Sequence, residues 1–276
     1  MKPTFLNQDR PLFTVMIQRF TPDEAFDTIK KAIPEGADAF GIQFECFGKE
    51  YRNKETYKKL FSATEGRPVY VTNYRHNNNE GKTDEELAEG LVELAECGAT
   101  LIDVMGDMFC RHPQELTDDP EAIKKQMELI DRLHAKGAEV LMSSHVLKYT
   151  EPERVLEIAK AQEARGADIC KIVTYANDDI EQGENLKMIA MLKKELKIPF
   201  LYLCGGNCRV LRRIGPMLGC TMWLCVQEHH ELSTKTQPVL KNVRAVWENF
   251  RDYDYVFLQR TASAVLFLSE AFGKEA

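Results

Sequence analysis

The chain has 276 residues, 44% of them hydrophobic and 29% charged, and a formal net charge of -7. This composition is that of a globular protein with a substantial core, and the acidic balance excludes a general binder of nucleic acid or membrane surfaces, which would present a basic face. No basic start precedes an apolar signal core, and no apolar run approaches the about 18 residues of a membrane span. We therefore expect a cytoplasmic protein.

The eight cysteines are scattered along the chain rather than grouped. A core of this size needs no disulfide bonds, so we expect reduced thiols. Cys204 and Cys208 lack the two-residue spacing of a zinc knuckle, and no second pair accompanies them. The adjacent His229 and His230 would point to opposite sides of a strand. Neither pattern predicts a metal site.

Short apolar runs recur along the chain, each with the length of a buried strand. They cover residues 12–17, 37–44, 68–72, 100–105, 139–142, 168–173, 199–203 and 219–226. Amphipathic segments with apolar residues every three or four positions separate several of them, at 84–97, 120–136, 152–165 and 185–196. A strand followed by a helix, repeated about eight times, predicts a closed (β/α)8 TIM barrel of the α/β class.

The ends of the expected helices support this alternation. Thr83 with Glu86, and Thr150 with Glu153, have the spacing of a capping box. The dipeptide Gly-Ala, which is typical of the short helix-to-strand connections of such barrels, precedes four expected strands at residues 36, 98, 137 and 166.

No linker rich in Pro, Gly or Ser divides the chain. We expect one barrel domain over residues 1–251 and a C-terminal helical extension over residues 252–276, with its helix at 256–272. The main alternative is an open doubly wound sheet. That fold would want a glycine-rich phosphate loop after an early strand, and neither a G-x-G-x-x-G nor a Walker sequence is present.

A lysine lies at the centre of the expected sixth strand. Lys171 is flanked by Ile169 and Ile172, and an ammonium buried there must find a partner or lose its proton. A neutral amine is a nucleophile that forms a Schiff base with a ketone. The fifth strand leads to His145 at the catalytic face of the barrel. On its own this is an ordinary loop histidine, but beside Lys171 it supplies a group that titrates near neutrality.

Polar side chains follow three other strands. Arg75, after the third strand, has a planar fork that can hold an anion, and Glu80 in the same loop can orient a histidine. The asparagines of that loop are equally typical of a solvated turn. Glycines after the seventh strand precede a helix with three arginines, one of which we expect to face inward: Arg209, Arg212 and Arg213. The loop after the eighth strand is polar and long enough to act as a lid.

These residues resemble type I 3-dehydroquinate dehydratase, the Schiff-base enzyme of the shikimate and quinate routes. The match is strongest from Val140 to His145, at Thr150-Glu151-Pro152 and from Gly166 to Ile172. There the family carries a serine-x-histidine, a threonine-proline and an alanine-aspartate-isoleucine-x-lysine. The resemblance runs from the first strand to the helix after the eighth.

The resemblance implies a set of roles. Lys171 forms the imine with the substrate ketone, and His145 moves protons during imine chemistry and the loss of the hydroxyl. Glu80 orients His145. Arg75 with Glu80-Gly81 is similar to the family's arginine and glutamate-glycine-glycine loop, although the loop is one residue longer here and Lys82 stands for the last glycine.

The resemblance also implies how the substrate is held. Arg212 pairs with the substrate carboxylate, and Arg213 takes this place if the register slips. Ser233 and Gln237 are similar to the serine and glutamine of the family's mobile substrate loop and close over the substrate. We accordingly expect a small-molecule carboxylate substrate, no metal, no organic cofactor, and a chain for which a homodimer is plausible.

Two departures concern substrate recognition. Gly41 and Gln43 stand where the family presents a glutamate and an arginine to the substrate hydroxyls, and Met105, beside Asp103, replaces a carboxylate. Missing polar partners for substrate hydroxyls lower selectivity by several powers of ten. We expect a lyase that dehydrates 3-dehydroquinate to 3-dehydroshikimate, with a Schiff-base dehydratase or aldolase of another hydroxylated keto compound as the alternative. A third alternative is an inactive barrel that serves as a binding module, against which the buried lysine argues.

Overall fold

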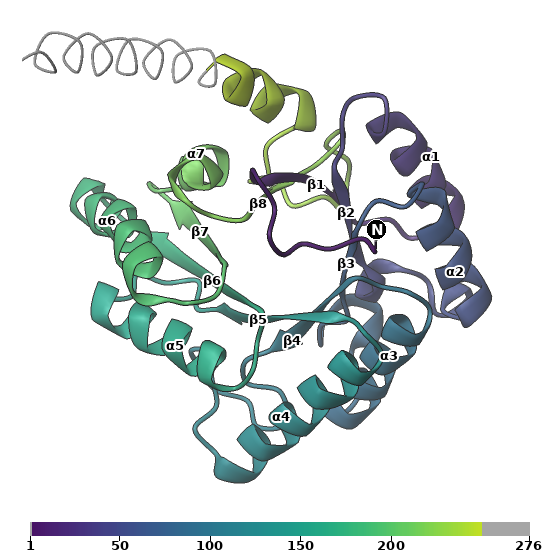
Figure 1. The fold of residues 1–276 in the computed structure, drawn as a ribbon, viewed down its shortest axis with the longest axis horizontal. Helices are drawn as coiled ribbons and strands as arrows, with labels where there is room; N and C mark the ends of the chain where they lie inside the picture. The colour runs from purple at the N-terminus through teal and green to yellow at the C-terminus, as the bar shows by residue number, and fades with distance from the viewer. Residues whose placement is uncertain (1, 250–276) are drawn as a thin grey trace, which may run out of the picture.

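Residues 2–249 are described in a computed structural model, in which a ring of parallel strands is surrounded by helices (Figure 1). The eight strands pair in the order β7-β6-β5-β4-β3-β2-β1-β8. The two ends of this sheet meet at a backbone hydrogen bond of 2.9 Å from Thr221 to Phe200. The predicted (β/α)8 TIM barrel is therefore confirmed, and the doubly wound alternative is excluded.

The strands are β1 (Leu12–Ile17), β2 (Ala39–Gln43), β3 (Val69–Thr72), β4 (Leu101–Met105), β5 (Glu139–His145), β6 (Ile169–Ala176), β7 (Phe200–Gly206) and β8 (Met222–Cys225). The α-helices are α1 (Pro22–Ala32), α2 (Lys54–Ala63), α3 (Asp84–Glu96), α4 (Pro120–Ala135), α5 (Pro152–Ala164), α6 (Asp179–Glu195) and α7 (Leu211–Leu218). A last helical segment begins at residue 240 and is described as far as residue 249.

Every predicted strand overlaps an observed one, and β5 ends at His145 as expected, but β5, β6 and β7 each continue three residues past their apolar runs. The added residues include Ser143, Ser144 and His145 in β5 and Thr174 in β6. The apolar runs end at these polar side chains, whereas the backbone pairing of the strands does not depend on side-chain polarity. The extended ends carry the residues that matter most for the site.

The helix boundaries partly follow the predicted caps. The capping box of Thr83 and Glu86 is present at the start of α3. The one predicted for α5 is wrong, because the helix begins at Pro152, whose fixed φ suits the first helical position, and its cap residue Glu151 makes no side-chain hydrogen bond. A capping box at the start of α1, between Thr21 and Glu24, was not predicted.

The interior of the barrel is polar at the level where β4, β5 and β6 meet. Ser143 lies opposite both Met105 and Lys171 in the strand register. Side chains on alternate strand positions point to opposite faces, so one face of each strand packs on helices while the other lines the interior. Contacts described below bring Tyr70, Asp103, Ser143 and Lys171 together there.

Among residues 2–249, no helix is both long and apolar enough to cross a membrane. The predicted C-terminal extension over residues 252–276, with its helix at 256–272, lies outside the described residues. Gly36, Gly98, Gly137 and Gly166 precede strands as expected, and all four have positive φ, between 77° and 105°. Side chains rarely adopt this conformation, which explains glycine at these helix ends.

Candidate active site

Lys171 is held inside the barrel by three hydrogen bonds. Its Nζ donates to the hydroxyl of Tyr74 at 2.8 Å, to the hydroxyl of Tyr70 at 3.0 Å and to Oδ2 of Asp103 at 3.1 Å. The residue is only 4% exposed. Of the two fates predicted for a buried lysine, the structure shows the first: the amine has found a carboxylate partner.

Asp103 is the centre of this cluster. Its Oδ2 accepts hydrogen bonds from both tyrosine hydroxyls and from Lys171, and its Oδ1 accepts one from Ser143. Burial alone would raise the pKa of Asp103, but the nearby Lys171 and then His145 outweigh it and leave the pKa below its ordinary value. The site therefore contains a fully buried carboxylate that is ionised at neutral pH.

The hydroxyls of Tyr70 and Tyr74 stay protonated in these surroundings. Burial first, and then the charge of Asp103, hold the pKa of both phenols well above its usual range. Tyr70 belongs to β3, whereas Tyr74 follows that strand at the C-terminal face of the barrel. The ring of Tyr74 packs edge-on against the His145 ring, with 5.3 Å between centroids. Tyr74 thus contacts both predicted catalytic residues.

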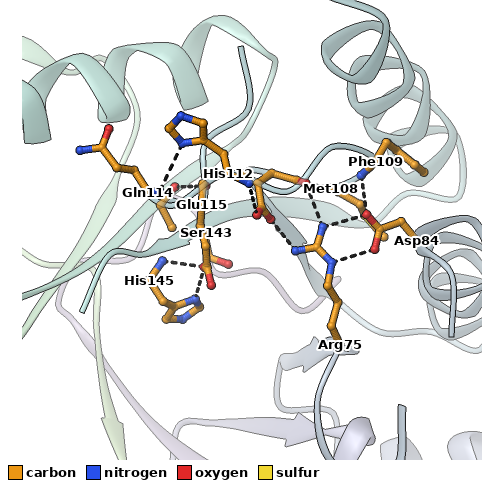
Figure 2. A network of polar contacts seen from close by, with 12 residues as sticks. Arg75, Asp84, Met108, Phe109, His112, Gln114, Glu115, Ser143 and His145 are labelled. Carbon is orange, nitrogen blue, oxygen red and sulfur yellow. Dashed lines mark hydrogen bonds and ion pairs between the residues drawn. The ribbon is translucent and has the colours of Figure 1, made fainter. Parts of the chain in front are cut away.

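His145 lies at the end of β5 and is oriented by Glu115. Oε2 of Glu115 is 2.8 Å from the ring Nδ1 of His145 and accepts from its backbone N–H at 2.7 Å (Figure 2). A carboxylate only accepts hydrogen bonds, so this contact places a proton on Nδ1 and leaves Nε2 for chemistry. Burial opposes ionisation of Glu115, but its bonds to His145 keep its pKa below the ordinary value.

The loop that carries Glu115 is held in place by hydrogen bonds to its backbone. Its carbonyl oxygen accepts a hydrogen bond of 2.6 Å from Ser144, and the residue has a φ of 45°, which side chains rarely adopt. The buried guanidinium of Arg165 donates to the carbonyls of Gly106 and Thr117, which flank this loop. Sequence reasoning missed Glu115, because a contact across 30 residues from an irregular loop has no local pattern.

The structure contradicts the prediction that Glu80 orients His145. Glu80 is exposed, and the carboxylate that contacts the His145 ring is that of Glu115. The reason lies one residue earlier, where the buried amide of Asn79 donates to Oδ1 of Asn73 and to the carbonyl of Tyr74. This anchors a 3-10 turn over Asn77–Asn79 and directs the following residue outward.

The structure also contradicts the prediction that Arg75 holds a substrate anion. Its guanidinium donates to both carboxylate oxygens of Asp84, at 2.7 and 2.8 Å, and to the carboxylate and carbonyl of Asp107 (Figure 2). Two carboxylates already neutralise this one cation. Arg75 borders the mouth of the barrel, but its ion pairs connect the segment after β3 to α3 and to the loop after β4.

Of the three candidate arginines, Arg209 and Arg212 line a cavity of about 850 Å³ beside β6 and β7. Arg213 is exposed and is absent from its lining. Nε of Arg212 is buried and has no hydrogen-bond partner among the described residues. An unpaired, half-buried guanidinium is a suitable partner for an anionic ligand.

The loop after β8 reaches the mouth through different residues than predicted. Ser233 and Gln237 are buried, and Ser233 exchanges hydrogen bonds with the backbone of His230 in its own loop. The cavity beside Arg212 is lined instead by Thr234 and Thr236.

Thr234 ties this loop to the barrel. Its hydroxyl accepts from Gln18 at 2.8 Å, and the same Gln18 amide donates to Gln43 at 2.6 Å. Neither Gln18 nor Thr234 was singled out from the sequence. Thr234 and Leu147 also line the adjoining mouth cavity of about 450 Å³, which contains Tyr74, Glu115 and His145.

The position of the family's strand-two glutamate is filled in this chain. A Cβ atom at Gly41 would lie 2.3 Å from Sδ of Met16 and 3.1 Å from the ring of Tyr70. Met16 and Tyr70 are themselves buried. Any side chain at position 41 therefore requires Met16 to move.

A parallel (β/α)8 barrel with a buried lysine inside β6 and a carboxylate-oriented histidine at the C-terminal end of the neighbouring β5 has the architecture of an enzyme, of the class that acts on carbonyl compounds through a lysine imine. Residues 13–249 match the family Type I 3-dehydroquinase. The chain belongs to this family and is thus a carbon–oxygen lyase of the shikimate-pathway dehydratase type.

Solved structures with this fold include several 3-dehydroquinate dehydratases. The enzyme from Geobacillus kaustophilus HTA426 is 15% identical with a TM-score of 0.74, covering 89% of this chain and 93% of that one. The type I enzyme from Clostridium difficile, with covalent modified comenic acid, is 17% identical with a TM-score of 0.74 and covers 89% and 94%. The enzyme from Enterococcus faecalis is 15% identical with a TM-score of 0.71 and covers 90% and 98%. A comparison with curated protein sequences gave no match.

Proposed function

We propose that this chain dehydrates 3-dehydroquinate to 3-dehydroshikimate, with Lys171 as the residue that forms the imine. The observation that carries the proposal is that a buried lysine and an oriented histidine lie on adjoining strands in a chain of this family. Lys171, on β6, is buried and contacts Asp103. His145 lies on the adjoining β5, and Glu115 fixes its Nδ1. A protonated imine draws electrons from the neighbouring carbon and acidifies it, so that a histidine can remove its proton.

His145 performs the proton transfers at carbon. Its free Nε2 takes the proton from the carbon next to the imine, the electrons form the new double bond, and the hydroxyl on the following carbon leaves. The imidazolium gives its proton to this hydroxyl, so that water is released and the histidine returns to its starting form. Glu115 stabilises the imidazolium and keeps the ring in one tautomer.

Arg212 binds the substrate carboxylate in this proposal. It is the half-buried cation with an unpaired Nε, and Thr234 and Thr236 line the same cavity. Ser233 and Gln237 then act through the loop that carries these threonines. Arg75 is left out of the binding set because Asp84 and Asp107 occupy it.

The test follows ultraviolet absorbance after purified protein is added to 3-dehydroquinate, because the product is a conjugated enone and the substrate is not. We expect a rise with the wild type and none with Lys171→Ala. Borohydride added with the substrate is expected to trap an adduct on Lys171 that intact mass spectrometry detects. A wild type that produces neither signal contradicts the proposal.

A second candidate function is the same imine chemistry on another hydroxylated keto acid. It is favoured by Gly41, Gln43 and Met105, which provide no charged partners for the hydroxyls of the substrate. The borohydride test separates the two, since an adduct with another keto acid but not with 3-dehydroquinate would favour the second. We further propose that the enzyme is cytoplasmic, which its acidic charge and free cysteines support. We also propose a homodimer, for which light scattering should give twice the mass of one chain.

A further inference from the structure

The lysine amine is separated from the mouth cavity by Tyr74. Tyr74 and His145 line this cavity, whereas Lys171 is absent from its lining. All three hydrogens of the ammonium are donated to Tyr70, Tyr74 and Asp103. A ketone that enters from the mouth therefore meets Tyr74 before it reaches the amine, and the hydroxyl of this tyrosine lies 2.8 Å from Nζ, where the new carbon–nitrogen bond must form.

Imine formation requires protons to move from nitrogen to oxygen. An ammonium carries three hydrogens and the protonated imine keeps one, so two protons leave Nζ while the carbonyl oxygen gains two and departs as water. A base must contact Nζ and an acid must lie next to the oxygen. Asp103 Oδ2 is 3.1 Å from Nζ and also accepts a hydrogen bond from Tyr74.

His145 is placed for a different task. Among the described residues its side chain hydrogen-bonds to Glu115 and not to Lys171 or Asp103. Its ring packs against the Tyr74 ring with 5.3 Å between centroids, and within residues 2–249 no direct hydrogen bond joins the imidazole to Nζ. The protons released at nitrogen have a continuous path to Tyr74 instead.

We propose that Tyr74 is the catalytic acid of imine formation and that Asp103 is the base that serves it. The inference rests on the proposed function, because it concerns the imine at Lys171. It assigns to a tyrosine of this chain the proton transfers at the nitrogen end of the reaction. His145 keeps those at carbon.

The step balances as follows in atoms and charge. Asp103 takes one proton from the Lys171 ammonium, and the amine attacks the ketone carbon while the carbonyl electron pair moves to oxygen. Tyr74 gives its proton to that oxygen and is reprotonated by Asp103. Asp103 then takes a second proton from nitrogen, Tyr74 protonates the hydroxyl, the carbon–oxygen bond breaks, and the nitrogen lone pair forms the C=N bond. Asp103 passes this second proton to Tyr74. The products are a protonated imine and one water, with Tyr74 and Asp103 restored.

Tyr70 provides a matched control for Tyr74. Its hydroxyl also contacts Nζ of Lys171 and Oδ2 of Asp103, so Tyr70→Phe and Tyr74→Phe each remove the same two hydrogen bonds. Tyr70 is fully buried inside the barrel and lines neither of the two cavities at its mouth. Only Tyr74 borders the space that the ketone enters.

The experiment measures the rate of adduct formation in a His145→Ala background, where the steps at carbon are blocked. Protein is mixed with 3-dehydroquinate, quenched with sodium borohydride at increasing times, and analysed by intact mass. We expect Tyr74→Phe to slow adduct formation about 10²-fold, the usual contribution of an acid–base group, and Tyr70→Phe to slow it far less. Circular dichroism checks that both variants are folded.

The alternative outcomes overturn the inference. Equal slowing by the two variants would mean that both hydroxyls merely position the lysine, and no slowing by Tyr74→Phe would remove it from the reaction. If Tyr74→Phe fails to fold, 3-fluorotyrosine at position 74 keeps the hydroxyl, and its greater acidity must shift the pH profile of trapping. Absence of any adduct in the wild type overturns the proposed function and this inference together, whereas an adduct with either unfavourable pattern overturns this inference alone.

Discussion

One oxygen of Glu115 contacts His145 twice, through the backbone N–H at 2.7 Å and through the ring Nδ1 at 2.8 Å. This geometry fixes the position of the strand end and the tautomer of its side chain with the same atom. This carboxylate comes from the loop after β4. The sequence predicted that the loop after β3 would supply it, but that loop directs Glu80 to solvent.

We predict that Glu115→Gln lowers kcat by about 10²–10⁴-fold, because an amide does not hold the imidazole in the required tautomer or stabilise its charged form. Steady-state absorbance assays measure the effect. The matched control is Glu80→Gln, which is expected to retain wild-type kcat. The reverse ranking of the two variants would restore the role that the family pattern gives to Glu80.

Arg75 and Arg212 are predicted to fail in different ways. Arg212→Ala should raise KM for the carboxylate substrate with little effect on unfolding, because its Nε has no partner in the described protein. Arg75→Ala should lower the free energy of unfolding by about 3 kcal/mol or more, because it leaves Asp84 and Asp107 without their cation. Denaturant unfolding and KM, measured on both variants, give the comparison. A higher KM for Arg75→Ala at unchanged stability would contradict this assignment.

Glu45 makes stability depend on pH. Complete burial raises its pKa from 4.5 to about 7, against the hydrogen bonds from its own backbone and from Thr72. Between these values the folded protein holds a proton that the unfolded chain has released. Its contribution to stability is therefore greatest below pH 4.5 and falls as the pH rises to about 7, by about 3 kcal/mol in all.

Glu45→Gln, which is neutral at every pH, should lack this decline. Urea unfolding at pH 5 and pH 8 measures it as the difference between variant and wild type. Glu80→Gln serves as the control and should decline as the wild type does. Parallel declines in the wild type and Glu45→Gln would show that other groups cause the pH dependence.

Gly41 and Met16 are predicted to be energetically coupled. Gly41→Ala places a Cβ 2.3 Å from Sδ of Met16, so we expect a loss of about 1–3 kcal/mol from overpacking. Met16→Ala alone should cost about 2–5 kcal/mol because it leaves a cavity. The double variant should be more stable than the sum of the two losses implies, which a double-mutant cycle measures. Strict additivity would show that Met16 moves aside without cost.

The periodic features of the sequence predicted the barrel well because strands and helices differ in their apolar spacing. The same features located Lys171 and His145, since a charged or titratable residue is conspicuous in or after an apolar strand. The residues that contact Lys171 and His145 could not be predicted from these features. Glu115 approaches His145 from an irregular loop, and the exit of Glu80 depends on a turn that buried Asn79 anchors. Such contacts are set by the tertiary structure and carry no local period.

The enclosure of Lys171 has a consequence for the cell as well as for the reaction. Amines exposed on a protein surface combine slowly with the aldehydes and acylating agents that metabolism produces. Without substrate, Lys171 is only 4% exposed. Its amine donates hydrogen bonds to three partners, of which Tyr74 separates it from the mouth cavity. We expect this enclosure to slow such side reactions of the nucleophile, so that it reacts with a ketone held in the mouth of the barrel.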